Sequence, residues 1–234
     1  MYRRFLKRIF DFLLALLIIV IGWPVFALIA LLIRVKIGKR VIFAQLRPGR
    51  DEKLFTIYKF RTMTDAKDAS GQLLPDEQRL TKFGSRLRAL SFDELPEIFN
   101  ILKGDMSFIG PRPLLVKDYI FFDDAIRARQ KIRPGLSGWA QVCGRNNASW
   151  EQKFIRDAEY LAKYSFAMDA KIFFMTFFKS FVTMENINTD GMATAENYGD
   201  YLLRIGAITK ERYDERIAKS EELISEFVEK RRHR

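Results

Sequence analysis

The longest feature of the hydrophobic pattern is a run of 22 residues without a charged side chain, from Phe12 to Ile33. As a helix, with a rise of ~1.5 Å per residue, this run would be about 33 Å long, which is enough to cross the hydrocarbon core of a bilayer. A cleaved signal peptide needs an apolar stretch of only ~7–15 residues and a small-residue cleavage site, and the run fits neither requirement. It therefore predicts a membrane segment.

Basic residues flank this segment on both sides, at Arg3, Arg4, Lys7, Arg8, Arg34, Lys36, Lys39 and Arg40. Because basic flanks favour the cytoplasmic side, both ends should lie there. In the middle, Gly22-Trp23-Pro24 predicts a break, since proline removes an intrahelical donor and disfavours the helical conformation of the residue before it. We therefore expect a re-entrant helix–break–helix that enters one leaflet and returns. The alternative is a Pro-kinked helix that spans the bilayer.

The next part of the chain alternates short apolar runs with turn signals. Val41–Gln45 and Phe55–Phe60 are rich in β-branched and aromatic residues, and Pro48-Gly49-Arg50-Asp51 between them predicts a turn. These runs predict a small antiparallel β-hairpin. Residues 64–80 are polar and predict a surface loop.

Short elements follow up to residue 138. Helices are expected from Leu80 to Arg88 and from Pro96 to Lys103, where Gly104 stands at the C-cap position. Residues 109–113 and 132–138 contain proline and glycine and predict rigid loops without regular structure.

The remaining pattern is helical and amphipathic. Ser149, with a glutamine three positions later, predicts a capped helix that reaches about Tyr164. Residues 169–184 are aromatic nearly all round, which indicates a helix either in a core or in a membrane interface. Residues 210–230 are highly charged with a thin apolar stripe. This stripe suits a partner helix, including that of a second copy in a homo-oligomer, or a membrane surface, or packing on its own domain.

These elements predict an α+β fold that is mainly α. It comprises an N-terminal re-entrant membrane helix, a small antiparallel β-hairpin and interfacial amphipathic helices. We expect a membrane-anchoring part at residues 1–40, a catalytic part at 41–184 and a C-terminal helical extension at 185–234.

Composition narrows the chemistry. The net charge is +11, but residues 1–50 hold ten basic residues and one acidic residue, so the excess charge lies beside the apolar segment. Membrane lipids rather than nucleic acid are therefore the expected partner. Cys143 is the only cysteine and His233 the only histidine, which excludes intrachain disulfides, multi-cysteine zinc sites and nucleophiles activated by histidine.

Two adjacent carboxylates, Asp93 and Glu94, lie in the segment Ser91-Phe-Asp-Glu-Leu-Pro96. In one interpretation this is only a helix start, with Ser91 or Asp93 as cap and Glu94 at the capping-box position. A carboxylate at such a helix terminus would be held ionised, as an anionic nucleophile or a magnesium ligand requires.

Basic residues that could bind a phosphorylated substrate surround this pair in the sequence, at Lys59, Arg61, Arg88, Arg112 and Arg145. Guanidinium groups match phosphate oxygens, and Arg112 stands between two prolines that would hold it on a stiff loop. Each of these residues alone is more commonly a solvated surface charge. Together with the carboxylates and the membrane segment, they predict a site for a phosphorylated substrate at the bilayer surface.

Several ordered motifs resemble those of the bacterial sugar transferases, the monotopic polyprenyl-phosphate phosphoglycosyl transferases. They are FAQLRPGR at 43–50, FTIYKFRTM at 55–63, SFDELP at 91–96, LKGDMSFIGPRP at 102–113 and RPGLSGWAQVCGRN at 133–146. The resemblance covers residues 1 to about 182. Two positions depart from the family pattern: Trp23 precedes Pro24 where serine is common, and Cys143 stands where asparagine is frequent.

The resemblance implies a catalytic pair at Asp93 and Glu94 and a Mg²⁺ ion that Asp93 touches. It implies the transfer of a sugar 1-phosphate from a UDP-sugar to undecaprenyl phosphate with release of UMP, through a covalent aspartyl phosphosugar. It also implies a re-entrant helix at the cytoplasmic face of the bacterial inner membrane. Two other functions stay open: a membrane-associated glycosyltransferase that releases UDP, and a non-enzymatic membrane scaffold. The sequence does not identify the sugar or the glycan.

Overall fold

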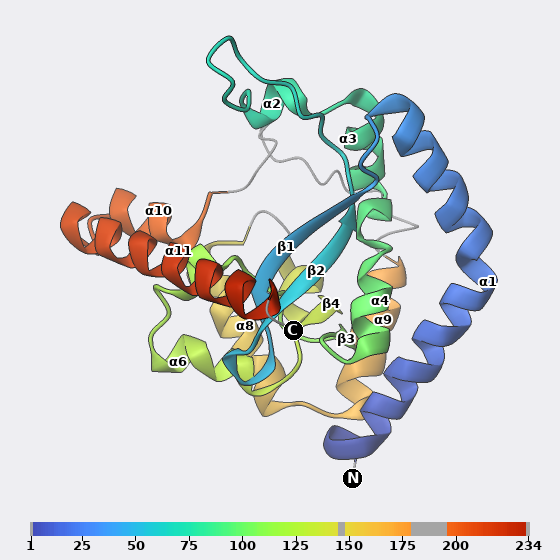
Figure 1. The fold of residues 1–234 in the computed structure, drawn as a ribbon. Coiled ribbons are helices and arrows are strands. Elements are labelled where there is room, and N and C mark those ends of the chain that lie inside the picture. The colour runs from blue at the N-terminus through green and yellow to red at the C-terminus, as the bar shows by residue number, and fades with distance from the viewer. Residues whose placement is uncertain (1, 145–147, 179–195, 233–234) are drawn as a thin grey trace.

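The computed structural model describes residues 2–144, 148–178 and 196–232. Helices make up most of this part, and two small two-stranded sheets lie among them (Figure 1). The structure therefore confirms a mainly helical α+β chain with a long apolar helix at its N-terminus.

The N-terminal helix α1 (Lys7–Lys36) follows a π-helical turn, η1 (Tyr2–Leu6). Its helical geometry continues through Pro24, and Figure 1 shows that the helix bends near its middle. The predicted break is therefore a bend within one helix. In the described residues α1 alone is long and apolar enough to cross a membrane, and only 11% of its most apolar 18-residue window is buried.

The predicted hairpin is confirmed. Strands β1 (Ile42–Pro48) and β2 (Leu54–Phe60) pair antiparallel, from Ile42 opposite Phe60 to Pro48 opposite Leu54. A short 3₁₀ turn, η2 (Arg50–Glu52), connects them.

Helix α4 (Glu97–Lys103) packs against β2 through buried side chains, among them Ile57 and Ile101. The Asn100 side chain fixes this packing, because its Oδ1 accepts from the Tyr58 amide at 3.1 Å and its Nδ2 donates to the Thr56 carbonyl at 2.7 Å. The predicted helix start at Pro96 and the glycine at 104 are both observed as the caps of α4.

The second sheet corrects the sequence prediction. Strands β3 (Ser107–Ile109) and β4 (Gly135–Ser137) pair in parallel, although residues 109–113 and 132–138 had been expected to lack regular structure. The pairing depends on glycine, since a Cβ at Gly135 would lie 2.1 Å from the Gly110 nitrogen.

The remaining helices before residue 179 are short, apart from α8 and α9. They are α2 (Asp76–Arg79), α3 (Lys82–Ala89), η3 (Phe92–Glu94), α5 (Val116–Tyr119), α6 (Asp124–Arg127), η4 (Ala128–Lys131), α7 (Trp139–Gly144), α8 (Trp150–Ala162) and α9 (Phe166–Phe178). Helix α2 lies inside the predicted loop 64–80, where one helical turn forms after Pro75. The capping box at Ser149 is confirmed, with reciprocal bonds of 3.3 and 3.2 Å to Gln152.

Helix α9 has one buried and one exposed face. Asp169 is buried, pairs with Lys7 of α1 and accepts from the Tyr160 hydroxyl at 2.5 Å. The opposite face exposes Phe166, Phe173, Phe174, Phe177 and Phe178. Each of the two interpretations of this segment thus fits one face, while residues 179–184 lie outside the described part of the chain.

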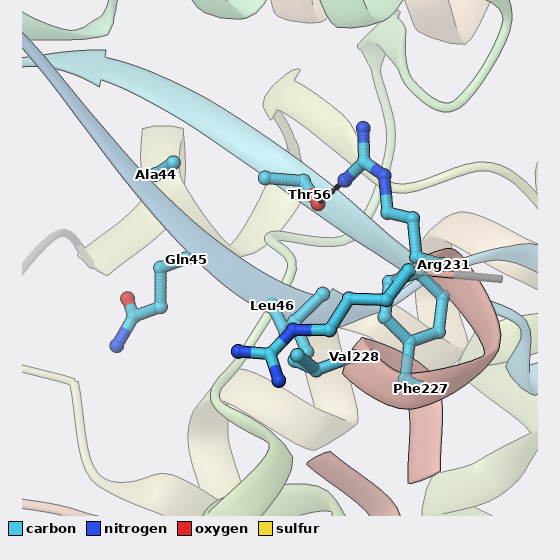
Figure 2. Close-up of a pocket in the computed structure, with 8 residues that line it drawn as sticks. Ala44, Gln45, Leu46, Thr56, Phe227, Val228 and Arg231 are labelled. Atoms are coloured by element: carbon cyan, nitrogen blue, oxygen red, sulfur yellow. Dashed lines mark hydrogen bonds between the residues drawn. The ribbon is translucent and has the colours of Figure 1, made fainter. Parts of the chain in front are cut away.

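At the C-terminus, α10 (Tyr198–Arg204) and α11 (Lys210–Arg232) pack on the rest of the chain. Tyr213 stacks on Phe121, and Arg231 donates to the Thr56 hydroxyl at 2.9 Å. A cavity of about 300 Å³ lies between the end of α11 and the hairpin. Figure 2 shows Phe227 and Arg231 among the residues that line it. Of the alternatives for this helix, packing on its own domain is the one that the structure shows.

Candidate active site

The carboxylate pair lies in the 3₁₀ turn η3, between α3 and α4. Ser91 enters this turn in the left-handed region at φ 56°, and its side chain makes no cap hydrogen bond. Backbone bonds close the turn instead, from the Glu94 amide to the Ser91 carbonyl at 3.2 Å and from the Leu95 amide to the Phe92 carbonyl at 3.3 Å. The predicted cap at Ser91 or Asp93 is therefore wrong, and Pro96 precedes α4 without a side-chain cap.

Glu94 joins the turn to two basic side chains. Its Oε1 lies 2.6 Å from Lys59 Nζ, at the end of β2, and 2.7 Å from the NH2 atom of Arg112, in the loop after β3. Lys59 Nζ also lies 3.1 Å from Glu97 Oε1, in the first turn of α4. The fold thus brings together four groups from three segments that are distant in the sequence.

Asp93 stands apart from this chain of ion pairs. It is 9% exposed, and no hydrogen bond to its carboxylate is present within the described part of the chain. Burial and the charge of Glu94 raise the pKa of Asp93 to about 6, although Lys59, Arg88 and Arg112 lower it. This corrects the expectation of a carboxylate held ionised by a helix terminus: burial makes Asp93 a more basic group than an ordinary aspartate.

Glu94 has the opposite behaviour. Burial disfavours its charge, but Arg112 and Lys59 together hold its pKa well below the usual range. Glu94 in turn raises the pKa of Arg112. The adjacent carboxylates therefore differ in charge behaviour, since Glu94 stays ionised and holds two cations, whereas the pKa of Asp93 is about 6.

Sequence reasoning missed Glu97, which is 2% exposed. Burial raises its pKa to about 7, although Lys59 lowers it. The available sequence signal was its position three residues after Glu94, at the start of the predicted helix. Glu97 belongs to the site because its carboxylate pairs with Lys59, which lies on strand β2.

The other predicted basic residues have different surroundings. Arg88 Nε donates to the Thr62 hydroxyl at 3.0 Å, and the Asp93 charge acts on its guanidinium. Arg61 pairs instead with Asp65 at 2.6 Å in the following loop. Arg145 lies outside the described residues. The structure therefore brings Lys59 and Arg112 to the carboxylates, with Arg88 near them, and Arg61 makes its ion pair elsewhere.

The carboxylates of the site are compatible with a magnesium ion that is bound by few protein side chains. Within the described residues, no group of three or more His, Cys, Asp or Glu side chains is arranged around a metal position. Mg²⁺ commonly takes only one or two carboxylates and completes its shell with phosphate oxygens and water. Asp93, a buried carboxylate for which the described part of the chain offers no hydrogen bond, could supply such a ligand.

The site lies against the apolar helix α1. Leu95, directly after Glu94, packs with Phe26, Ile29 and Ile33 of α1 in a cluster that also contains Phe60 at the end of β2. The same helix exposes many apolar side chains away from the chain, including Trp23 at 64%. The candidate site therefore adjoins an apolar surface that is suited to lipid.

Comparison with known proteins identifies the family of this chain. The family model for bacterial sugar transferases matches residues 2–183. The uncharacterized sugar transferase EpsL of Bacillus subtilis (strain 168) is 46% identical over 193 residues, which cover 82% of this chain and 95% of that protein.

Two other relatives have more specific names. The UDP-glucose:undecaprenyl-phosphate glucose-1-phosphate transferase of Escherichia coli (strain K12) is 38% identical over 189 residues, which cover 76% of this chain but only 41% of that protein. The exopolysaccharide production protein ExoY of Sinorhizobium fredii (strain NBRC 101917 / NGR234) is 34% identical over 187 residues, which cover 73% of this chain and 83% of that protein. The chain belongs to the bacterial sugar transferase family.

Proposed function

We propose that this enzyme transfers a sugar 1-phosphate from a UDP-sugar to undecaprenyl phosphate and releases UMP. The observation that carries the proposal is Asp93, a buried carboxylate that makes no hydrogen bond within residues 2–144, 148–178 and 196–232 and that lies in the field of Lys59, Arg88 and Arg112. The name of the E. coli relative supports the donor and acceptor classes.

In the first step, an Asp93 oxygen attacks the β-phosphorus of the UDP-sugar. A carboxylate–phosphorus bond forms, the bond from the β-phosphorus to the bridging oxygen breaks, and UMP leaves with that oxygen. In the second step, a phosphate oxygen of undecaprenyl phosphate attacks the same phosphorus and the Asp93 carboxylate is released. Two displacements separate the encounter with a soluble substrate from the encounter with a lipid substrate.

The surrounding residues position the substrate and neutralise its negative charge. These are the main contributions of a protein to phosphoryl transfer. Arg112 is half-exposed and can reach the diphosphate while Glu94 orients it. Lys59 is held by Glu94 and Glu97 and adds a second positive charge beside Asp93. A Mg²⁺ ion held by Asp93 and the phosphates would neutralise negative charge on the diphosphate.

The proposal places the enzyme at the cytoplasmic face of the bacterial inner membrane, with α1 as a re-entrant helix. At its start, Asp11 accepts from the Phe108 amide at 3.2 Å, and near its end Ile33 is buried against the catalytic part. The bend seen in Figure 1 brings both ends back toward the same side. A helix that spanned the bilayer would place its two ends on opposite sides. Because both ends of α1 pack on the same domain, a re-entrant helix accounts for them more simply.

The identity of the released nucleotide tests the reaction. The purified enzyme, incubated with undecaprenyl phosphate, Mg²⁺ and a panel of UDP-sugars, is expected to release UMP with one of them. Release of UDP would instead indicate a glycosyltransferase that moves the sugar alone, and an inactive protein would favour the scaffold.

Asp93→Asn tests the nucleophile. This variant should lose turnover and the sugar-bearing adduct that mass spectrometry detects on residue 93 when acceptor is omitted, because an amide does not replace the carboxylate as nucleophile. Asp68→Asn is the matched control, since Asp68 is exposed and makes bonds only within its own loop. Near-normal activity of Asp93→Asn would refute the assignment.

A further inference from the structure

The loop that carries Arg112 is held at three successive carbonyls. Each accepts a hydrogen bond from a residue outside the loop: the Pro111 carbonyl from the Gly135 amide at 2.9 Å, the Arg112 carbonyl from Arg129 NH2 at 2.8 Å and the Pro113 carbonyl from Arg47 NH1 at 3.2 Å. The two prolines also restrict φ on both sides of Arg112. The backbone of this one residue is therefore fixed although its side chain is 47% exposed.

The middle contact comes from a buried ion pair. Arg129 is 5% exposed and Asp157 is 4% exposed. Arg129 Nε donates to Asp157 Oδ2 at 2.9 Å, and its NH2 atom lies 2.8 Å from the same oxygen. That NH2 atom also donates to the Arg112 carbonyl, so one rigid guanidinium links helix α8 to the Arg112 loop.

Stability alone does not account for such a pair. Two buried charges lose their hydration, and apolar side chains of similar volume often stabilise a fold as well or better. What an apolar pair could not supply is a charged donor aimed at the Arg112 carbonyl. The ring centres of Phe122 and Phe154 lie 5.7 and 6.0 Å from the Arg129 guanidinium carbon, and these rings restrict the guanidinium further.

We propose that Arg129 and Asp157 are positioning residues that hold the Arg112 backbone, so that the Arg112 guanidinium meets both Glu94 and the substrate diphosphate. The inference rests on the proposed function, in which Arg112 binds the diphosphate. Neither residue of the pair touches substrate.

Arg129→Lys and Asp157→Asn test the pair, each made in the natural chain and in an Arg112→Ala chain. We measure kcat/KM for nucleotide release and, independently of turnover, the affinity for UDP by calorimetry. In the natural chain each substitution should lower kcat/KM about tenfold, since small displacements of a positioning group are costly. In the Arg112→Ala chain the same substitution should change kcat/KM less than about twofold, because the guanidinium that the pair positions is already absent.

Ile101→Ala controls for a general loss of stability. Ile101 is fully buried in α4, in a core cluster to which residues 110–113 do not belong, and its truncation should lower the thermal midpoint by an amount comparable to the substitutions of the pair. This variant should lose equal factors of activity with and without Arg112. If Arg129→Lys and Asp157→Asn also lose equal factors in both chains, the pair is only structural and the inference is overturned.

The two proposals fail differently. Release of UDP instead of UMP, or no release, would overturn the proposed reaction, while the coupling between Arg129 and Arg112 would still appear in the affinity for UDP. Affinity for UDP that falls equally in both chains would overturn the positioning role whatever the reaction is. A natural chain that does not bind UDP would overturn both.

Discussion

At the scale of single residues, the charge of Asp93 depends on burial and Glu94 acting against three basic side chains. Because these effects place its pKa at about 6, we expect kcat/KM for UMP release to rise through pH 6 and to level off above it, as the nucleophile loses its proton. Glu94→Gln removes a charge that raises this pKa, so its acidic limb should move to lower pH although its activity is lower. Rate profiles from pH 5 to 8 measure both, and an unchanged limb in Glu94→Gln would assign the limb to another group.

Glu97 leads to a prediction about stability rather than rate. Its pKa in the folded chain is about 7 against a usual 4.5, so the unfolded state loses this proton first and stability falls as pH rises from about 4.5 to 7. This pKa difference corresponds to about 3 kcal/mol at most. Glu97→Gln cannot ionise, and its thermal midpoint relative to the natural chain should be more favourable at pH 8 than at pH 5.

Glu94→Gln serves as the control of opposite sign. The pKa of Glu94 is lowered on folding, so its ionisation stabilises the fold above its usual pKa of 4.5, and this stabilisation is lost as the pH falls below 4.5. Relative to the natural chain, this variant should therefore be less stable at pH 5 than at pH 3. Parallel shifts of the two variants would show that these directions are wrong.

At the scale of elements, the sequence predicted what local signals determine. The hairpin, the capped start of α8 at Ser149 and the glycine after α4 each depend on residues within a few positions of one another. The β3–β4 pair was missed because its strands have three residues each and meet only through the fold. The left-handed Ser91 and the buried Glu97 were missed for a related reason. Contacts between distant segments, such as the ion pair of Lys59 with Glu97, shape the site, and the hydrophobic pattern of the sequence does not indicate such contacts.

One contact between elements assigns a role to Arg8, which the sequence grouped only with the basic residues that flank the apolar segment. Arg8 of α1 donates to the Ile101 carbonyl at 2.6 Å and to the Leu102 carbonyl at 2.7 Å, where α4 ends. Such bonds satisfy terminal carbonyls and place a positive charge at the negative end of the helix. Arg8→Ala should therefore destabilise the chain by about 2 kcal/mol, seen as a fall of roughly 4–8 °C in the thermal midpoint in detergent.

Arg34→Ala is the matched control for this contact. It removes the same charge from an exposed position near the other end of α1 and should shift the midpoint by less than about 2 °C. Equal shifts would mean that Arg8 acts only through the charge of the helix flanks.

At the scale of the whole molecule, the membrane helix and the catalytic part form one packed unit. Lys7 reaches Asp169 in α9, Ala15 is buried among residues of β2 and α4, and Ile33 packs with Phe60 and Leu87. The exposed phenylalanines of α9 add to the apolar surface that α1 presents. An active site built beside this surface can meet a lipid phosphate without lifting the lipid out of the bilayer.

This arrangement predicts that both ends of α1 face the same compartment. Cys143 is the only native cysteine, so a Cys143→Ser chain can carry single substitutions Phe5→Cys, Trp23→Cys and Lys39→Cys for labelling with a membrane-impermeant maleimide. In inverted inner-membrane vesicles, positions 5 and 39 should be labelled and position 23 should react only after detergent is added. In spheroplasts none should be labelled, since basic flanks keep both ends in the cytoplasm. A spanning helix would instead expose position 5 and position 39 to opposite compartments, and that result would contradict the re-entrant arrangement while leaving the chemistry at Asp93 untouched.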